Sequence, residues 1–188
     1  MEAYQNAGSG LKKMFIAEVG AIICTVLMII PIVNLIAAIG AIVFMVISLV
    51  GLYGAGQEIE GCKMAFMVTI INMVVSVLES FLGNIAVLGT IISIAQSVLS
   101  FLVIYYVCTS VAEVMNKIGQ AEVAQKGETV WKINMVCYIV NIAVAILSLI
   151  PVLNILAGIA SVVIAIVSVV AMILYMIFLN KSYQALGA

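Results

Sequence analysis

Long runs of apolar residues fill this chain from Met14 to Leu179, and short stretches with polar or helix-breaking residues separate them. Several runs approach or exceed the roughly 20 residues that an α-helix needs to cross the hydrocarbon core of a bilayer. At about 1.5 Å per residue, helices of this length match the thickness of that core. The pattern predicts an all-α integral membrane protein with six transmembrane helices, at 14–31, 35–55, 64–81, 85–112, 133–150 and 154–179.

One short phrase occurs twice. The stretches IIPIVNLIAAIG and LIPVLNILAGIA match in register, with Pro31 corresponding to Pro151 and Asn34 to Asn154. Proline discourages a preceding helix from continuing, because it lacks an N–H and its ring clashes with the turn behind it. Asparagine is a favourable N-cap for the helix that follows. The spacing Pro-x-x-Asn therefore predicts a tight turn between two antiparallel helices.

A third, degenerate copy of this helical hairpin lies between the other two. A lysine precedes the turn asparagine at similar spacing in the pairs Lys13–Asn34, Lys63–Asn84 and Lys132–Asn154. Repeats of this kind are a common way to build membrane proteins. We expect one transmembrane domain, 1–188, made of three sequential hairpins that form parallel pseudo-repeats, at 11–60, 61–112 and 131–181. The alternative is that apolar helices resemble one another by composition alone.

The lysines indicate the orientation of the chain. If the six helices alternate in direction, all seven lysines fall at one face of the membrane; they are Lys12, Lys13, Lys63, Lys117, Lys126, Lys132 and Lys181. The positive-inside rule then places both termini in the cytoplasm. The turns at the other face are so short that they leave little room for a lysine. We expect a multi-pass protein of the cytoplasmic membrane, of bacterial type.

The stretch 113–130 is expected to be a cytoplasmic, amphipathic linker. Glu113 and Lys117 form a favourable i,i+4 pair, and apolar residues recur at helical spacing around them. The fourth helix is expected to continue past the interface and to end near Gly119 or Gly127. The linker could dock a cytoplasmic partner, or it could simply cover the inner mouth of the bundle.

Composition excludes several classes of function. Of the 188 residues, 66% are hydrophobic and 8% are charged, against roughly 25% charged in a typical soluble domain. The net charge of −1 provides no basic surface for nucleic acid. The chain has no His, Asp or Arg, and its four cysteines are scattered. Because the usual groups for acid–base and metal chemistry are missing, we expect no enzyme activity, no cofactor and no metal site.

Polar residues inside the predicted spans are the candidate binding residues. Asn72, Gln96 and Asn141 should lie near mid-membrane, where an amide without a partner is costly. They either line a pocket for a small solute or hydrogen-bond between helices as structural contacts. Glu18, in the first helix, is the remaining candidate. It could take part in proton coupling, or it could reach interfacial water or a lysine.

Three functions remain open from the sequence. The scarcity of charge inside the spans favours a membrane assembly protein, which packs through its helix faces in the lipid bilayer against another membrane protein or a second copy of itself. The mid-membrane amides favour a small-solute transporter or a substrate-binding membrane subunit. The third alternative is an oligomeric channel.

Overall fold

The computed structural model describes residues 4–82, 86–147 and 154–187, and these residues are helical apart from short connections. The described residues form six helices, α1 (Gln5–Leu27), α2 (Asn34–Ala55), α3 (Glu60–Leu82), α4 (Ala86–Lys117), α5 (Ala121–Leu147) and α6 (Asn154–Ala185). The predicted all-α class is therefore confirmed for the described part of the chain.

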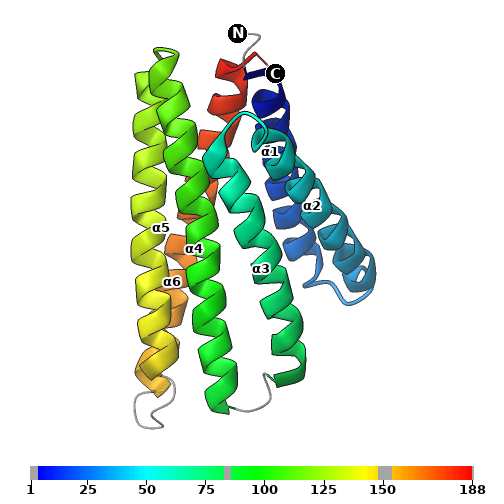
Figure 1. The fold of residues 1–188 in the computed structure, drawn as a ribbon. Coiled ribbons are helices and arrows are strands. Elements are labelled where there is room, and N and C mark those ends of the chain that lie inside the picture. Colours follow the sequence, from blue (N-terminus) through cyan, green and yellow to red (C-terminus); the bar gives the residue numbers. More distant parts are fainter. Residues whose placement is uncertain (1–3, 83–85, 148–153, 188) are drawn as a thin grey trace.

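Consecutive helices run up and down, and each packs against its neighbour in sequence (Figure 1). Helix α1 also packs against α6, so the six helices close into a ring. Both termini and the α2–α3 and α4–α5 connections lie at one end, which we call the lysine end; the opposite end is the turn end. Helix α4 packs on α5 about as extensively as on α3. The predicted hairpins are thus present as neighbours, but the second and third do not form separate units.

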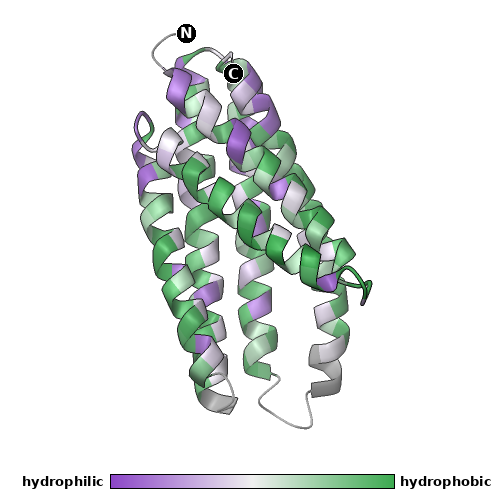
Figure 2. Ribbon diagram, turned by 90° about the vertical axis from the view of Figure 1, so that its right-hand side faces the viewer, coloured by the Kyte–Doolittle hydropathy of each residue, from purple (hydrophilic) through white to green (hydrophobic). Residues whose placement is uncertain are grey.

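Large apolar side chains face outward on the described helices. Ile32 is 90% exposed and Phe81 is 75% exposed, and many other large apolar residues are exposed as well. Figure 2 shows that most of the ribbon is hydrophobic and that hydrophilic residues gather toward the end with both termini. Among the described residues, helices α2 to α6 are long and apolar enough to cross a membrane. This combination fits lipid rather than water as the surrounding medium. The chain is a multi-pass helical membrane protein.

Helix α1 differs from the other five. It has 23 residues, and every 18-residue stretch of it contains Lys12, Lys13 and Glu18. Three charged residues are more than a stretch of this length usually contains in a membrane span, so α1 does not qualify as a span by composition, whereas the other five helices do. Of the six spans predicted from the sequence, the structure supports five by length and hydropathy.

The helices extend beyond the apolar runs at the lysine end. Helix α1 begins at Gln5 instead of residue 14, and α5 begins at Ala121 instead of residue 133. Apolar runs mark only the part of a helix that lipid would cover, whereas polar turns outside it are stabilised by i,i+4 ion pairs. Such pairs join Glu113 to Lys117 at 2.8 Å, Glu128 to Lys132 at 3.3 Å, and Glu122 to Lys126.

The expected linker 113–130 consists mostly of helix ends. It comprises the end of α4, a short connection through Gly119, and the beginning of α5. Gly119 has a φ of 79°, a left-handed conformation that favours glycine and ends α4. The predicted end near Gly119 is confirmed. Gly127 lies inside α5, where its Cα packs against the ring of Phe178.

The first predicted turn joins α1 to α2, but its cap differs from the prediction. Val33 occupies the N-cap position of α2 and makes no side-chain cap hydrogen bond, while Asn34 is the first residue inside the helix. The prediction that Asn34 caps α2 was wrong by one position. Backbone hydrogen bonds stabilise the connection instead. The N–H groups of Ile30 and Val33 donate to the carbonyl oxygens of Leu27 and Ile30. The turns expected at 82–84 and 151–154 fall largely outside the described residues.

Helices α1 and α2 cross at very short range through glycines. A Cβ atom added to Gly10 would lie 2.5 Å from the Gly51 carbonyl oxygen and 2.5 Å from the Ala55 amide nitrogen. Small residues are the usual means by which membrane helices approach this closely, because dispersion contacts replace the hydrophobic effect in lipid. The crossing fixes the first hairpin at the lysine end.

A carboxylate from another connection caps the start of α1. The Glu58 side chain accepts hydrogen bonds from the backbone N–H groups of Asn6, at 3.2 Å, and Ala7, at 2.8 Å. The first N–H groups of a helix have no partner within the helix, and a negative charge is favourable there. The contact ties the α2–α3 connection to the beginning of α1.

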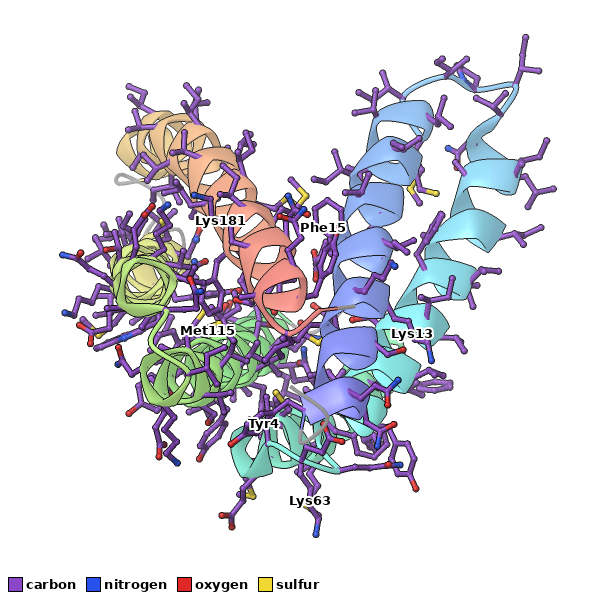
Figure 3. All side chains as sticks on the ribbon, turned by 90° about the horizontal axis from the view of Figure 1, so that it is seen from above. Tyr4, Lys13, Phe15, Lys63, Met115 and Lys181 are labelled. Atoms are coloured by element: carbon purple, nitrogen blue, oxygen red, sulfur yellow. The ribbon has the colours of Figure 1, made fainter. Side chains whose placement is uncertain are left out.

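The apolar core of the described residues lies at the lysine end. Its largest fully buried side chains include Leu11, Met14, Leu52, Met115, Phe178 and Leu179. Toward the turn end, α1 and α2 lead away from α6, as the view along the bundle in Figure 3 shows. The bundle is therefore tightly packed at the lysine end and looser at the turn end.

Candidate functional site

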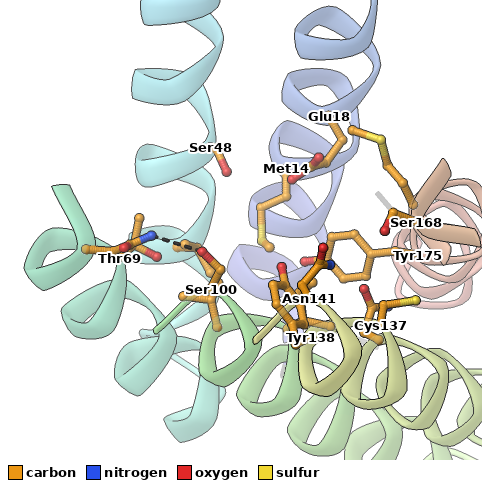
Figure 4. Close-up of a pocket in the computed structure, with 16 residues that line it drawn as sticks. Met14, Glu18, Ser48, Thr69, Ser100, Cys137, Tyr138, Asn141, Ser168 and Tyr175 are labelled. Carbon is orange, nitrogen blue, oxygen red and sulfur yellow. Dashed lines mark hydrogen bonds between the residues drawn. The ribbon is translucent and has the colours of Figure 1, made fainter. Parts of the chain in front are cut away.

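A cavity of about 430 Å³ lies inside the ring of helices (Figure 4). Each of the six helices contributes to its lining. This volume falls within the range of about 300–1,000 Å³ that is usual for small-molecule sites. The apolar part of the lining consists mainly of Met14, Leu52, Val103, Ile104, Cys137 and Met172.

Polar side chains from all six helices also line this cavity. They are Glu18 on α1, Ser48 on α2, Thr69 and Asn72 on α3, Ser100 on α4, Asn134, Tyr138 and Asn141 on α5, and Ser168 and Tyr175 on α6. Helical spacing explains how one helix supplies more than one of them, because residues three, four or seven positions apart share a face. The cavity thus combines hydroxyl, amide and carboxylate groups.

Asn72 links two helices and leaves one atom without a partner. Its Nδ2 group donates a hydrogen bond to Ser100 Oγ at 3.2 Å, which joins α3 to α4. Its Oδ1 atom is buried and accepts no hydrogen bond from the described residues. Most buried polar atoms in proteins have a partner, so a lone buried acceptor at a cavity requires an explanation.

Two other polar residues of the lining donate hydrogen bonds to backbone carbonyls of their own helices. Thr69 Oγ1 donates to the Ala65 carbonyl at 2.8 Å, and Asn134 Nδ2 donates to the Val130 carbonyl at 2.9 Å. The Thr69 hydroxyl and one of the two N–H donors of Asn134 are therefore occupied, and the oxygen atoms of these side chains still have acceptor capacity.

Glu18 is the one acidic residue among those that line the cavity. It is half-buried on α1, and no described residue forms an ion pair or hydrogen bond with its carboxylate. Lys13 and Lys12 precede it by five and six positions, which is a rotation of about 140° and 240° around the helix. Both lysines are exposed and lie on other faces of α1.

The structure brings together three of the four predicted site residues. Glu18, Asn72 and Asn141 all line the cavity. Gln96 does not line it; its Nε2 group donates to Ser76 Oγ at 3.1 Å, in a contact between α4 and α3. Of the two roles considered for the amides, Gln96 fits an interhelical contact, and Asn141 hydrogen-bonds to none of the described side chains.

Sequence reasoning did not select several of the lining residues. Asn134 lies seven positions before Asn141 on the same helix face, a spacing that could have identified it. Tyr138 and Tyr175 could not be recognised as lining residues from the sequence, because tyrosines in apolar helices are also common at membrane interfaces. Ser48 and Ser168 are single small polar residues, which membrane helices tolerate widely.

The arrangement is suited to binding by hydrogen bonds and charge. The described residues contain no group of three or more metal-ligating side chains, and the four cysteines are buried free thiols. The tyrosine rings and methionines give the cavity an apolar wall beside its polar groups. Comparison of the sequence with models of protein families, with curated proteins and with solved structures finds no match.

Proposed function

We propose that this chain binds a small polar solute in the cavity between its helices, as a transporter or a substrate-binding membrane subunit does. The observation that carries the proposal is the set of polar side chains which all six helices direct into one space. The proposal assigns no catalytic step to the chain. Of the functions that the sequence left open, we therefore favour solute transport or binding over membrane assembly.

Unpaired polar atoms support solute binding over structural contact. Residues that only hold helices together would satisfy one another, as Gln96 and Ser76 do. Asn72 Oδ1 and the Glu18 carboxylate have no such partner among the described residues. A bound solute would supply the missing donors, and the free energy of those contacts would be gained only on binding.

A ligand screen in detergent tests the proposal. A solute that occupies the cavity at about 100 times its Kd should raise the free energy of unfolding by about 2.7 kcal/mol, which corresponds to a Tm increase of roughly 5–10 °C for a domain of this size. Asn141→Ala should abolish the increase without breaking an existing hydrogen bond. Gln96→Ala, outside the cavity, is the matched control and should leave the increase intact. A broad screen without any stabilising solute would contradict the proposal.

We further propose that all six helices cross the membrane and that the lysine end lies in the cytoplasm of a bacterial cell. Helix α1 runs antiparallel to α2 along an extensive contact, which supports its crossing together with α2. Lys12, Lys13 and Lys63 are exposed near the end that holds both termini, and the positive-inside rule assigns that end to the cytoplasm.

Cysteine labelling in intact cells tests this orientation. The four native cysteines are buried, so they should give little background with a membrane-impermeant thiol reagent. Ile32 is 90% exposed in the turn between α1 and α2, so Ile32→Cys should be labelled in intact cells. Gln120→Cys, exposed in the α4–α5 connection, should be labelled only after the membrane is permeabilised. The reverse pattern would overturn the orientation.

A membrane assembly role is the second candidate. It is favoured by the turn-end half of the first hairpin, where Ile29, Ile32, Leu35 and Ile36 are all strongly exposed and α1 and α2 lead away from α6 (Figure 3). A partner helix or a second copy could cover this apolar surface. A partner that co-purifies in mild detergent, together with a negative solute screen, would favour this candidate over solute binding.

A further inference from the structure

We propose that the solute is an organic cation that carries a protonated amine, and that Glu18 is the residue that recognises its charge. This inference rests on the proposed function, since it names the chemical class of the solute that the cavity takes. It follows from the charge balance of the lining, the hydrogen-bonding capacity of its polar atoms and the position of its aromatic rings.

The lining has a negative group and no positive group. Glu18 is one of 16 residues that line the cavity, and no lysine is among them. Lys12 and Lys13 lie on other faces of α1, and the described ion pairs of the chain lie in the lysine-end segments of α4, α5 and α6. A carboxylate inside a membrane protein is unfavourable unless a cation or a proton compensates it. A cationic solute would provide that compensation when it binds.

The polar atoms of the cavity match the donors of an ammonium group. A primary ammonium has three N–H donors and no acceptor. Asn72 Oδ1 is a buried acceptor that no described residue satisfies, and the Glu18 carboxylate is acceptor-only when ionised. The Thr69 hydroxyl and one N–H of Asn134 are already directed to backbone carbonyls, and the remaining amide and hydroxyl groups of the lining can donate as well as accept. Because no lysine lines the cavity, its two acceptors without a partner among the described residues, Asn72 Oδ1 and the Glu18 carboxylate, favour a donor-rich cation over an anion.

Aromatic rings and thioethers complete the site for such a ligand. Tyr175 comes from α6, the neighbour of α1, and Tyr138 comes from α5; both line the cavity with Glu18 (Figure 4). Cations are attracted to the face of a tyrosine ring. Met14 and Met172 provide adaptable apolar surface for the carbon part of the solute.

The same ammonium chemistry could come from two sources. One is a water-soluble amine, and the other is the ethanolamine headgroup of a phospholipid in the surrounding bilayer. Both would place a primary ammonium beside Glu18. The two sources are separated by the form in which the amine is supplied, so the experiment includes one arm for each.

Thermal unfolding of the full chain in detergent, in an amine-free sodium phosphate buffer, tests the inference. The soluble arm compares two pairs of solutes with the same carbon skeleton, cyclohexylammonium with cyclohexanol and butylammonium with 1-butanol. The lipid arm compares added phosphatidylethanolamine with phosphatidylglycerol. Both arms use the wild-type chain, Glu18→Gln, and the control Glu79→Gln, which removes a carboxylate that lies outside the cavity and accepts a hydrogen bond from Ser93 Oγ at 3.4 Å.

We expect an ammonium compound or phosphatidylethanolamine to raise the Tm of the wild-type chain and of Glu79→Gln above the value with its uncharged or anionic counterpart. In Glu18→Gln the apparent affinity for the amine should fall about tenfold or more, because a charge-assisted contact is lost, while any binding of the alcohols persists. Stabilisation by soluble amines assigns a soluble solute, and stabilisation only by phosphatidylethanolamine assigns the headgroup. Either result supports the inference.

Other results overturn it. If alcohols and ammonium compounds stabilise the wild-type chain equally, the solute is not recognised as a cation, although the proposed solute binding survives. If no compound in either arm stabilises the chain but a neutral solute in the broad screen does, the inference of a cationic solute fails while the proposed solute binding survives. If Glu18→Gln does not fold, Glu18→Asp replaces it and should keep the preference for amines at lower affinity; loss of the preference in that variant contradicts the inference, because the charge is retained.

Discussion

Replacement of Gly10 by alanine is expected to destabilise the protein by about 3 kcal/mol or more. The added methyl group would lie 2.5 Å from two backbone atoms of α2, the Gly51 oxygen and the Ala55 nitrogen. Backbone atoms cannot move aside as a side chain can, so α1 and α2 would have to separate and lose their contact at this crossing. Thermal unfolding in detergent, followed by circular dichroism and by size-exclusion chromatography, should show a large fall in Tm or aggregation.

Gly158→Ala is the matched control for this substitution. Gly158 lies in α6, is exposed, and has no heavy atom within 4 Å of the position that a Cβ would occupy. The same change of residue there should leave the Tm unchanged or raise it slightly, because alanine favours a helix more than glycine does. If Gly10→Ala were as stable as Gly158→Ala, the close crossing of α1 and α2 would be wrong.

Phe178→Ala is expected to cost about 3–5 kcal/mol of stability, the usual range for a large aromatic side chain removed from a core. Phe178 is fully buried, and its ring packs against the Cα of Gly127 on α5. It lies on α6 one turn closer to the lysine end than Tyr175, which lines the cavity. Its loss should therefore also extend the cavity toward the lysine end. The free energy of unfolding, followed through the fluorescence of the single tryptophan, Trp131, would measure the cost.

The neighbouring residue provides the control. Ile177 is 43% exposed on the outside of α6, where lipid or detergent replaces the contacts that truncation removes. Ile177→Ala should change the free energy of unfolding by less than about 1 kcal/mol, since the apolar surroundings remain. Equal costs at the two positions would mean that Phe178 is not part of a packed core at the lysine end.

Both substitutions affect the lysine end, where the helices hold one another most tightly. The core, the Gly10 crossing and the cap that Glu58 provides for α1 all lie there. The candidate site begins directly beside this packed region, since Met14 and Leu52 belong both to the core and to the lining of the cavity. The site thus adjoins the most densely packed part of the bundle, which favours fixed positions for its polar groups.

The membrane class and the helices could be predicted from the sequence with few errors. Apolar runs long enough to cross a bilayer are a strong signal, and the structure describes a helix at each of the six expected places. The boundaries at the lysine end were less accurate, because helices continue into polar segments that hydropathy does not mark, as at Gln5 and Ala121. The triple repeat and the orientation are still predictions.

The candidate site could be predicted only in part. The depths of Asn72 and Asn141 followed from their distance to a lysine along a helix, and both residues line the cavity. Gln96, whose depth was counted from Asn84, does not line the cavity. Ser100, one turn further along α4, lines the cavity, whereas Gln96 bonds to Ser76 beside it. Depth along a helix is encoded locally, but the direction in which a side chain points is not.

The apolar runs and the positions of the lysines were enough to predict a set of membrane helices with the lysines toward one end, because length and hydropathy act on each helix separately. Which polar residues meet depends instead on how the helices pack. In a soluble protein the apolar face of a helix marks the interior, but in a membrane the lipid side and the interior are both apolar, so the rotation of each helix is set by packing. Gly10 and Gly51 let α1 and α2 approach, and the closed ring then places Glu18 in the same cavity as Asn72 and Tyr175.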